Sequence, residues 1–568
     1  MKKISRRNFL RAAGATAAVT ALGGMLSACG SSSSAGSAAG SAAGSTAAAE
    51  TTVTVAQISE VANLNPLIEP RTPDSNVQCM IFDYLVTPDK DLNYIGDLAS
   101  SWDISDDGLT YTFHLVENAV WHDGQPFTAD DVIYTLTAMA SPTYTGGASS
   151  RVLGIEGASD YQAGTATSVS GLSAPDTKTV VVKLASPNAA FLGNMYTAIL
   201  PKHVLESVDP ADWATADFNR SPIGTGKYKF VSWQAGQYIE LQKNPDYWGT
   251  APSIDHVFVR FGDETTLTAA LCNNEIDVLY GLSTADVDTI NAVQNVDVYQ
   301  YEQLSLYYIG LNLLCESLSD LKVRQALSYA LDKKTMVATV FGDYGYAADD
   351  IFPDGHWSHS TTVATYPYDV AKAKSLLEEA GYTMNASTGY YEKNGQTLHL
   401  TYDLVTSTDG DNFAALVQQY WKAAGVELEI IDQDFSTLAF TKLFPQNSDG
   451  TQREVTADDF MCYTLGFGVE ADPDEYRDYF TTSKGAGSWN FIHYSNAQVD
   501  ELFQKQLTLT DSDERAKCFH EIADLVSKDI PWIPLYGKFG LAGVNKSVSG
   551  FVCDFRGITF QIEKWSMT

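Results

Sequence analysis

The residue types used in catalysis occur in this chain, but not at the spacings that catalysis needs. His520 and Glu521 begin like a zinc-protease helix, yet no second histidine follows, and there is no Gly-x-Ser-x-Gly nucleophile turn. Acidic pairs are frequent in so acidic a chain, so carboxylates alone do not indicate a glycosidase. We therefore expect a protein that is not an enzyme, with a surface hydrolase as the remote alternative.

Metal and phosphate sites are equally poorly supported. His356 and His359 are either a metal-binding pair or two exposed loop histidines, and we favour the second interpretation. The segment 222–228 resembles a phosphate loop until Lys227, which Tyr228 follows where Ser or Thr is required. We expect no metal and no cofactor.

The cysteines after position 29 have no zinc-type spacing, although export would permit a disulfide. We expect them to be scattered buried thiols: Cys79, Cys272, Cys315, Cys462, Cys518 and Cys553.

Cys29 is the residue with the clearest covalent chemistry. It ends the run Leu-Ser-Ala-Cys after a basic start and an uncharged, apolar stretch over 12–28, which is typical of an export signal ending at a lipidated cysteine. Arg6 and Arg7 also fit a twin-arginine signal, and the general secretory route stays open. Segment 1–28 is thus expected to be a lipoprotein signal peptide and 29–49, rich in Gly, Ser and Ala, a flexible tether. The alternative is an ordinary cleaved signal with a chance cysteine.

Length and net charge limit the number of domains and the kinds of partner that we expect. The chain has 568 residues, enough for two or three domains, and a formal net charge of −34. Such a surface repels nucleic acid and anionic headgroups, so we expect no nucleic acid and contact with the membrane through the lipid anchor only. No second apolar run is long enough to span a bilayer.

Local patterns predict mixed α/β structure. Residues 52–57 alternate like a first strand, a helix is expected over 75–85, and 101–115 read as a hairpin with a turn at 105–108. Thr128 should cap a helix, with Asp130 and Asp131 at the positive end of its dipole. Segments 398–405, 412–424 and 426–431 predict a strand, a helix and a strand of a parallel sheet.

Several longer motifs resemble those of the family 5 extracellular solute-binding proteins, the receptors of oligopeptide, dipeptide and nickel ABC importers. The motifs stand in order along the whole chain after the tether: 98–115, 121–132, 199–203, 222–228, 244–249, 323–332, 368–377 and 531–536. The resemblance implies an α/β, two-lobe periplasmic-binding-protein-like fold (class II, large cluster C type) with an extra domain inserted in the first lobe. Lobe I would comprise 50–83, 186–302 and 532–568, the inserted domain 84–185, and lobe II 303–531.

The resemblance also implies a ligand held between the lobes. In peptide-binding members an aspartate after an aromatic, Gly-rich strand end holds the peptide α-ammonium. Here Phe467 replaces the usual Trp, and the aspartate aligns with Asp472, which we favour, or with Glu470. A surface turn around Pro473 is the structural alternative for Asp472. The other ligand-binding candidates are Asp74, Ser75, Asn76, Tyr536 and Lys538.

The function implied is that of a monomeric, lipid-anchored receptor on the outer face of the cytoplasmic membrane, which captures short peptides and delivers them to an ABC permease. A nickel or metallophore receptor, or an oligosaccharide receptor, of the same fold is the alternative, because an aromatic content of 11% suits sugars as well as peptides.

Overall fold

A computed structural model describes residues 50–68, 71–483 and 485–568. The signal peptide, the tether and Cys29 lie outside the described residues. The first described strand, β1 (Thr52–Gln57), has the bounds that the alternation predicts, and it pairs in parallel with β10 (His256–Phe261) and β11 (Val278–Tyr280). Strands that are far apart in the chain therefore build one sheet.

The largest sheet has twelve strands. Ten of them follow one path: β19 (Glu427–Gln433), β18 (His399–Val405), β20 (Cys462–Gly468), β13 (Ser305–Leu311), β21 (Trp532–Asn545), β11, β1, β10, β9 (Tyr238–Lys243) and β8 (Tyr228–Gln234). The other two, β12 (Val296–Glu302) and β14 (Gly345–Ala347), pair with β21.

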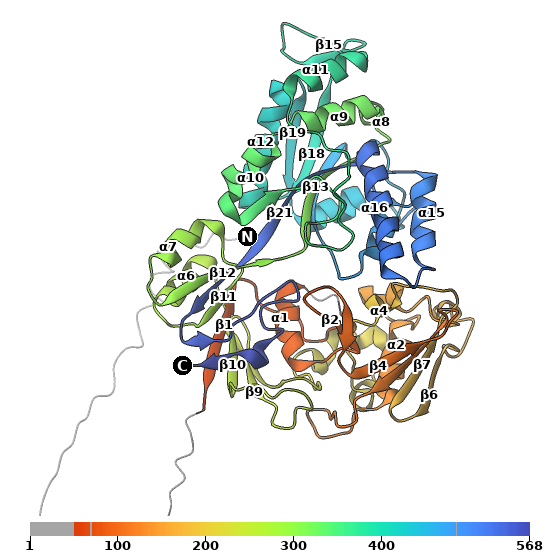
Figure 1. The fold of residues 1–568 in the computed structure, drawn as a ribbon, viewed down its shortest axis with the longest axis vertical. Coiled ribbons are helices and arrows are strands. Elements are labelled where there is room, and N and C mark those ends of the chain that lie inside the picture. The colour runs from red at the N-terminus through yellow and green to blue at the C-terminus, as the bar shows by residue number, and fades with distance from the viewer. Residues whose placement is uncertain (1–49, 69–70, 484) are drawn as a thin grey trace, which may run out of the picture. The chain divides into compact units, whose positions relative to one another are not determined.

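Strand β21 joins the two halves of this sheet (Figure 1). Its first part pairs with β13, where Trp532 lies opposite Gly310, and its last part pairs with β11, where Val544 lies opposite Val278. A second connection runs from β12 to β13, and Leu304 between them has a φ of 48°, a conformation that is uncommon for a residue with a side chain. The two strand crossings place a double connection between the halves.

The predicted hairpin is confirmed. Strands β4 (Ala99–Ile104) and β5 (Thr110–Leu115) pair antiparallel within a four-stranded sheet that continues to β7 (Thr179–Lys183) and β6 (Leu172–Asp176). Its hydrophobic side chains, such as Phe113, belong to the same buried cluster as Val55 and Ile239 of the large sheet. This smaller sheet is therefore packed on the first half of the molecule.

The helices flank these sheets. Those before residue 300 are α1 (Thr72–Ile81), α2 (Ala129–Met139), α3 (Ala158–Gln162), α4 (Phe191–Asn194), α5 (Lys202–Leu205), α6 (Glu264–Cys272) and α7 (Val287–Asn291). Those after it are α8 (Glu316–Ser319), α9 (Leu321–Tyr329), α10 (Lys333–Phe341), α11 (Val370–Glu379), α12 (Thr408–Ala423), α13 (Phe435–Thr437), α14 (Tyr476–Phe480), α15 (Ala497–Gln506) and α16 (Ser512–Asp529). In the described part of the chain, no helix has the length and apolar character to cross a membrane.

Two predictions of local structure are confirmed. Thr128 caps α2 in a capping box with Asp131, whose carboxylate accepts the Thr128 amide at 2.9 Å. Strands β18 and β19 are parallel, with α12 between them in the chain, and the α12 side chain of Trp421 is fully buried. The strand, helix and strand unit is therefore confirmed.

The helix expected over 75–85 is shifted. Helix α1 begins at Thr72, because Asp74 accepts the Arg71 amide at 2.9 Å and Pro73 suits a first turn. It ends at Ile81, because the next residue, Phe82, is extended (ψ 146°). The six cysteines in the described residues are free thiols, as predicted, but only four of them are buried, whereas Cys272 and Cys553 are half-buried.

Candidate functional site

Two cavities lie where segments from both halves of the molecule meet. The first, about 450 Å³, is lined by β21 and β20 together with the loops after β1, β11 and β18, and we call it the hinge cavity. The second, about 370 Å³, is lined by α1, the segments at 147–151 and 196–198, Glu470 and Arg556, and we call it the Glu470 cavity. Their volumes are in the range of small-ligand sites, roughly 300–1,000 Å³.

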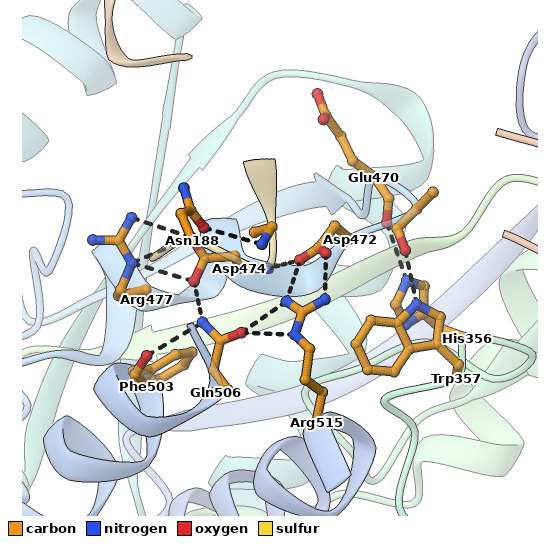
Figure 2. A network of polar contacts seen from close by, with 12 residues as sticks. Asn188, His356, Trp357, Glu470, Asp472, Asp474, Arg477, Phe503, Gln506 and Arg515 are labelled. Atoms are coloured by element: carbon orange, nitrogen blue, oxygen red, sulfur yellow. Dashed lines mark hydrogen bonds and ion pairs between the residues drawn. The ribbon is translucent and has the colours of Figure 1, made fainter. Parts of the chain in front are cut away.

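Asp472, the favoured ammonium ligand, is held by a protein cation. Both of its carboxylate oxygens accept hydrogen bonds from the Arg515 guanidinium, at 2.8 and 3.1 Å (Figure 2). The two side chains are only 9% and 10% exposed, and Gln506 accepts two further bonds from Arg515. Asp472 also accepts the Asp474 amide, which fixes the turn around Pro473. In this conformation the carboxylate anchors the loop to α16.

Glu470, the alternative residue, is placed differently. Its carboxylate points away from the Asp472 network (Figure 2), is 43% exposed and lines the Glu470 cavity. Among the described residues, its carboxylate pairs with Arg151, whose Nη2 lies 2.8 Å away and whose pKa is raised by the Glu470 charge. Glu470 is thus a partly solvated carboxylate at a cavity wall.

The backbone around Glu470 is fixed by buried side chains. The His356 ring nitrogen Nε2 lies 3.0 Å from the Glu470 carbonyl oxygen, and Trp357 donates to the next carbonyl at 2.8 Å. Burial lowers the pKa of His356 to about 4, so its ring is neutral near pH 7 and can donate that bond. The interpretation of His356 as an exposed loop histidine is therefore wrong, since the side chain is 4% exposed.

A second carboxyl group, that of Glu475, contacts the Glu470 backbone. Glu475 accepts the Glu470 amide at 3.0 Å, and burial, together with the nearby Glu470 charge, raises its pKa to about 8. At neutral pH Glu475 is therefore mainly protonated.

The three ligand-binding candidates on α1 lie in different environments. Asp74 is fully buried and its oxygens accept bonds from Ala62, at 2.6 Å, and from Arg71, so it serves the helix start. Asn76 is buried and donates to Gln57 at 3.3 Å. Ser75 lines the Glu470 cavity, and is the α1 candidate that the structure brings to Glu470.

The remaining candidates lie elsewhere. Tyr536 and Lys538 of β21 line the hinge cavity, where the Tyr536 ring stacks on Tyr307 at 4.7 Å. Phe467 packs edge-on against Tyr476 and Tyr479, in the hydrophobic cluster under β20. The predicted set is thus divided between two cavities and the core.

Sequence reasoning missed two groups of cavity residues. In the Glu470 cavity, Arg151 ends a short 3-10 helix (Gly147–Arg151) and Tyr196 lies in an irregular segment, and the local sequence carries no signal for either. Asp409 of the hinge cavity follows β18 at the start of α12, and the carboxyl ends of parallel strands are where ligands bind in α/β sheets. The predicted strand, helix and strand unit could have indicated Asp409.

Metal binding finds no support in the geometry. No group of three or more His, Cys, Asp or Glu side chains is arranged to hold a metal ion among residues 50–68, 71–483 and 485–568. His356 Nδ1 lies 2.7 Å from the Ser358 hydroxyl, and the His359 ring lies 3.1 Å from the Phe352 carbonyl. The His356 ring thus holds its own loop and the Glu470 backbone, and the His359 ring holds its own loop.

A sheet shared by two halves, a double strand crossing between them and cavities lined from both sides define an α/β solute-binding protein. Residues 93–488 match the model of the bacterial extracellular solute-binding proteins, family 5 (middle region). The chain belongs to this family, which consists of binding proteins and not of enzymes. Residues 3–23 match a twin-arginine translocation signal, which indicates export from the cytoplasm.

Relatives extend over nearly the whole chain. The oligopeptide-binding protein AppA of Bacillus subtilis is 29% identical over 527 residues, which cover 90% of this chain and 91% of that protein. The dipeptide-binding protein of Escherichia coli is 27% identical over 475 residues, 81% and 84% of the two chains.

Solved structures agree with this. The structure of AppA with a nonapeptide has a TM-score of 0.75 at 28% identity, and NikZ of Campylobacter jejuni with Ni(L-His) has 0.76 at 27%. Each covers 91% of this chain and 99% of its own.

Proposed function

We propose that the protein captures short peptides outside the cytoplasm and delivers them to the membrane permease of an ABC importer. The observation that carries the proposal is the Glu470 carboxylate, which lines a cavity of about 370 Å³ and is 43% exposed. Relatives named as oligopeptide- and dipeptide-binding proteins support the same class of ligand.

A receptor for varied peptides must use groups that every peptide has, the backbone and the α-ammonium. A carboxylate bond to an ammonium contributes about 1.5–3 kcal/mol. Asp472 is less suited to this task, because Arg515 occupies both of its oxygens. Glu470 is bonded through one oxygen to Arg151 and can accept a further donor, while Glu475 behind it is uncharged at neutral pH. We therefore assign the ammonium to Glu470 and a backbone contact to Ser75.

The test is calorimetric titration of the protein with a tripeptide and with the same tripeptide acetylated at its amino end. The proposal expects the acetylated peptide to bind at least tenfold more weakly, because it has no ammonium for Glu470. Equal affinity of the two peptides would contradict the assignment. Tight binding of a nickel–histidine chelate and of no peptide would replace peptide transport by metal transport, a ligand class seen with NikZ.

The lobe boundaries and the anchor complete the proposal. We assign lobe I to 50–83, 186–302 and 532–568, the inserted domain to 84–185 and lobe II to 303–531. Strand β21 and the β12 to β13 connection support this division, because they cross between the halves near these limits. Lipidation at Cys29 would hold this monomeric receptor near its permease, and the 29–49 tether would leave its orientation free. A Cys29→Ser variant should then be released from membranes and bind peptide with unchanged affinity. Retention of that variant in the membrane fraction would contradict the anchor.

A further inference from the structure

The hinge cavity has a chemistry distinct from that of the Glu470 cavity. Its floor is aromatic, because Tyr536 packs against Tyr307, Phe341 and Phe413 with ring centroids 4.6–4.7 Å apart, and Tyr402 also lines the wall. The charged side chains of its wall are Glu264, Asp409 and Lys538. Two carboxylates therefore face one ammonium, and the cavity carries a net negative charge.

Neither carboxylate is fully engaged in hydrogen bonds or close ion pairs with other described residues. Lys538 Nζ lies 3.9 Å from Asp409 Oδ2, a loose pair in which the lysine side chain is 31% and the aspartate side chain 43% exposed. Glu264 also lines the wall, and its Oε1 atom is buried and has no hydrogen-bond partner in the part of the chain that the structure describes. A buried acceptor without a donor is costly, and a turn of the Glu264 side chain toward a ligand donor would remove that cost.

Helix capping does not explain these acids. Asp263 caps α6 by accepting the Thr266 amide at 2.9 Å, and Ser407 caps α12 by accepting the Gly410 amide at 3.2 Å. Glu264 and Asp409 follow these caps in the first turns. They gain from the helix dipole, but they close no cap.

Tyr536 adds an independent sign of a ligand. It is 5% exposed and lines the cavity, and its hydroxyl makes no hydrogen bond to another described residue. A hydroxyl, an unpartnered carboxylate oxygen and aromatic faces together suit a planar, multiply donating cation. A free carboxylate of the ligand fits less well, because Glu264 and Asp409 would repel it and Lys538 already faces Asp409.

We propose that the hinge cavity is a specificity subsite for a guanidinium-bearing side chain, so that the receptor selects peptides with an arginine at one position. A guanidinium can stack on tyrosine and donate to carboxylates at the same time, which an ammonium does less well. The proposal rests on the proposed peptide-binding function and names the side chain that this function selects.

The test uses alanine hexapeptides in which a single arginine is moved through positions 2 to 6, each paired with the same peptide carrying citrulline, the neutral isostere. Calorimetry should find one position at which arginine binds at least tenfold more tightly than citrulline. In Glu264→Gln and Asp409→Asn proteins this ratio should fall below about threefold. Because the ratio is taken within each protein, a general loss of folded protein does not affect it.

The control is Asp288→Asn, which removes an exposed first-turn carboxylate from α7 that does not line the cavity. It should keep the full ratio. A ratio under threefold at all positions in the unaltered protein, or a tenfold ratio that survives both cavity variants, would overturn the subsite while peptide binding stands. Failure of every peptide to bind would overturn the subsite together with the proposed function.

Discussion

Asp472 and Arg515 form a buried, two-bond ion pair, with oxygen to nitrogen distances of 2.8 and 3.1 Å. The pair ties the loop after β20 to α16, and Gly193 of α4 lies beside this loop, since an added Cβ there would be in van der Waals contact with the Asp472 Cβ at 3.4 Å. The residue that the sequence favours as a ligand contact is thus engaged in holding the loop from which Glu470 projects.

Asp472→Asn should mainly lower stability. Removing one member of a buried pair leaves the Arg515 charge uncompensated, which costs about 3–5 kcal/mol of unfolding free energy. Urea unfolding measures this loss, and the double variant Asp472→Asn/Arg515→Gln should lose less than the sum of its single variants. Unchanged stability with a large loss of peptide affinity would return the ammonium contact to Asp472.

Glu470→Gln should mainly lower affinity. The side chain is 43% exposed, so its loss should change the unfolding free energy by less than about 1 kcal/mol. Peptide affinity should fall at least tenfold in calorimetry, and acetylation of the peptide should then cost nothing further, because both changes remove the same contact. Glu275→Gln, an exposed acid outside both cavities, is the matched control. Independent losses from the variant and the acetylation would contradict a direct contact.

Gly224→Ala should destabilise the fold. An added Cβ would lie 1.9 Å from the Ile81 carbonyl oxygen at the end of α1, and overpacking of this kind costs about 1–3 kcal/mol. Thermal unfolding should show a clear decrease, whereas Gly154→Ala, with open space around its Cβ, should show little change. Equal effects of the two variants would contradict the explanation that close packing against Ile81 requires a glycine at position 224.

The pH dependence of stability should carry the signature of Glu475. Its pKa is raised in the folded protein to about 8, so between the ordinary glutamate range and pH 8 the folded state binds more protons than the unfolded state. Stability contributed by this group is therefore present at low pH and is lost as pH rises through 8. Urea unfolding at pH 5 and pH 9 should show a larger decrease in the unaltered protein than in Glu475→Gln. Equal decreases in the two proteins would contradict Glu475 as the source of this pH dependence.

Features set by neighbouring residues could be predicted from the sequence. The bounds of β1, the Thr128 cap of α2 and the β18, α12 and β19 unit depend on alternation, capping and periodicity within short segments. The collinear motifs gave the two-lobe α/β class and the family, which the family match confirms.

The site could be predicted only in part, because its partners come from distant segments. Asp472 meets Arg515 across 43 residues, and Glu470 meets Arg151 across 319. No local pattern states that one carboxylate is occupied by a guanidinium and that its neighbour is open to a cavity. The acceptor of Glu264 that lacks a partner is equally a result of packing.

The measurement that tests the central claim most directly is native mass spectrometry of the full-length protein purified from its own cells under conditions that retain bound ligand. The account predicts a series of adducts whose fragment masses are those of short peptides, enriched in arginine. A single adduct with the mass of a metal chelate or an oligosaccharide, in the absence of any peptide, would contradict it.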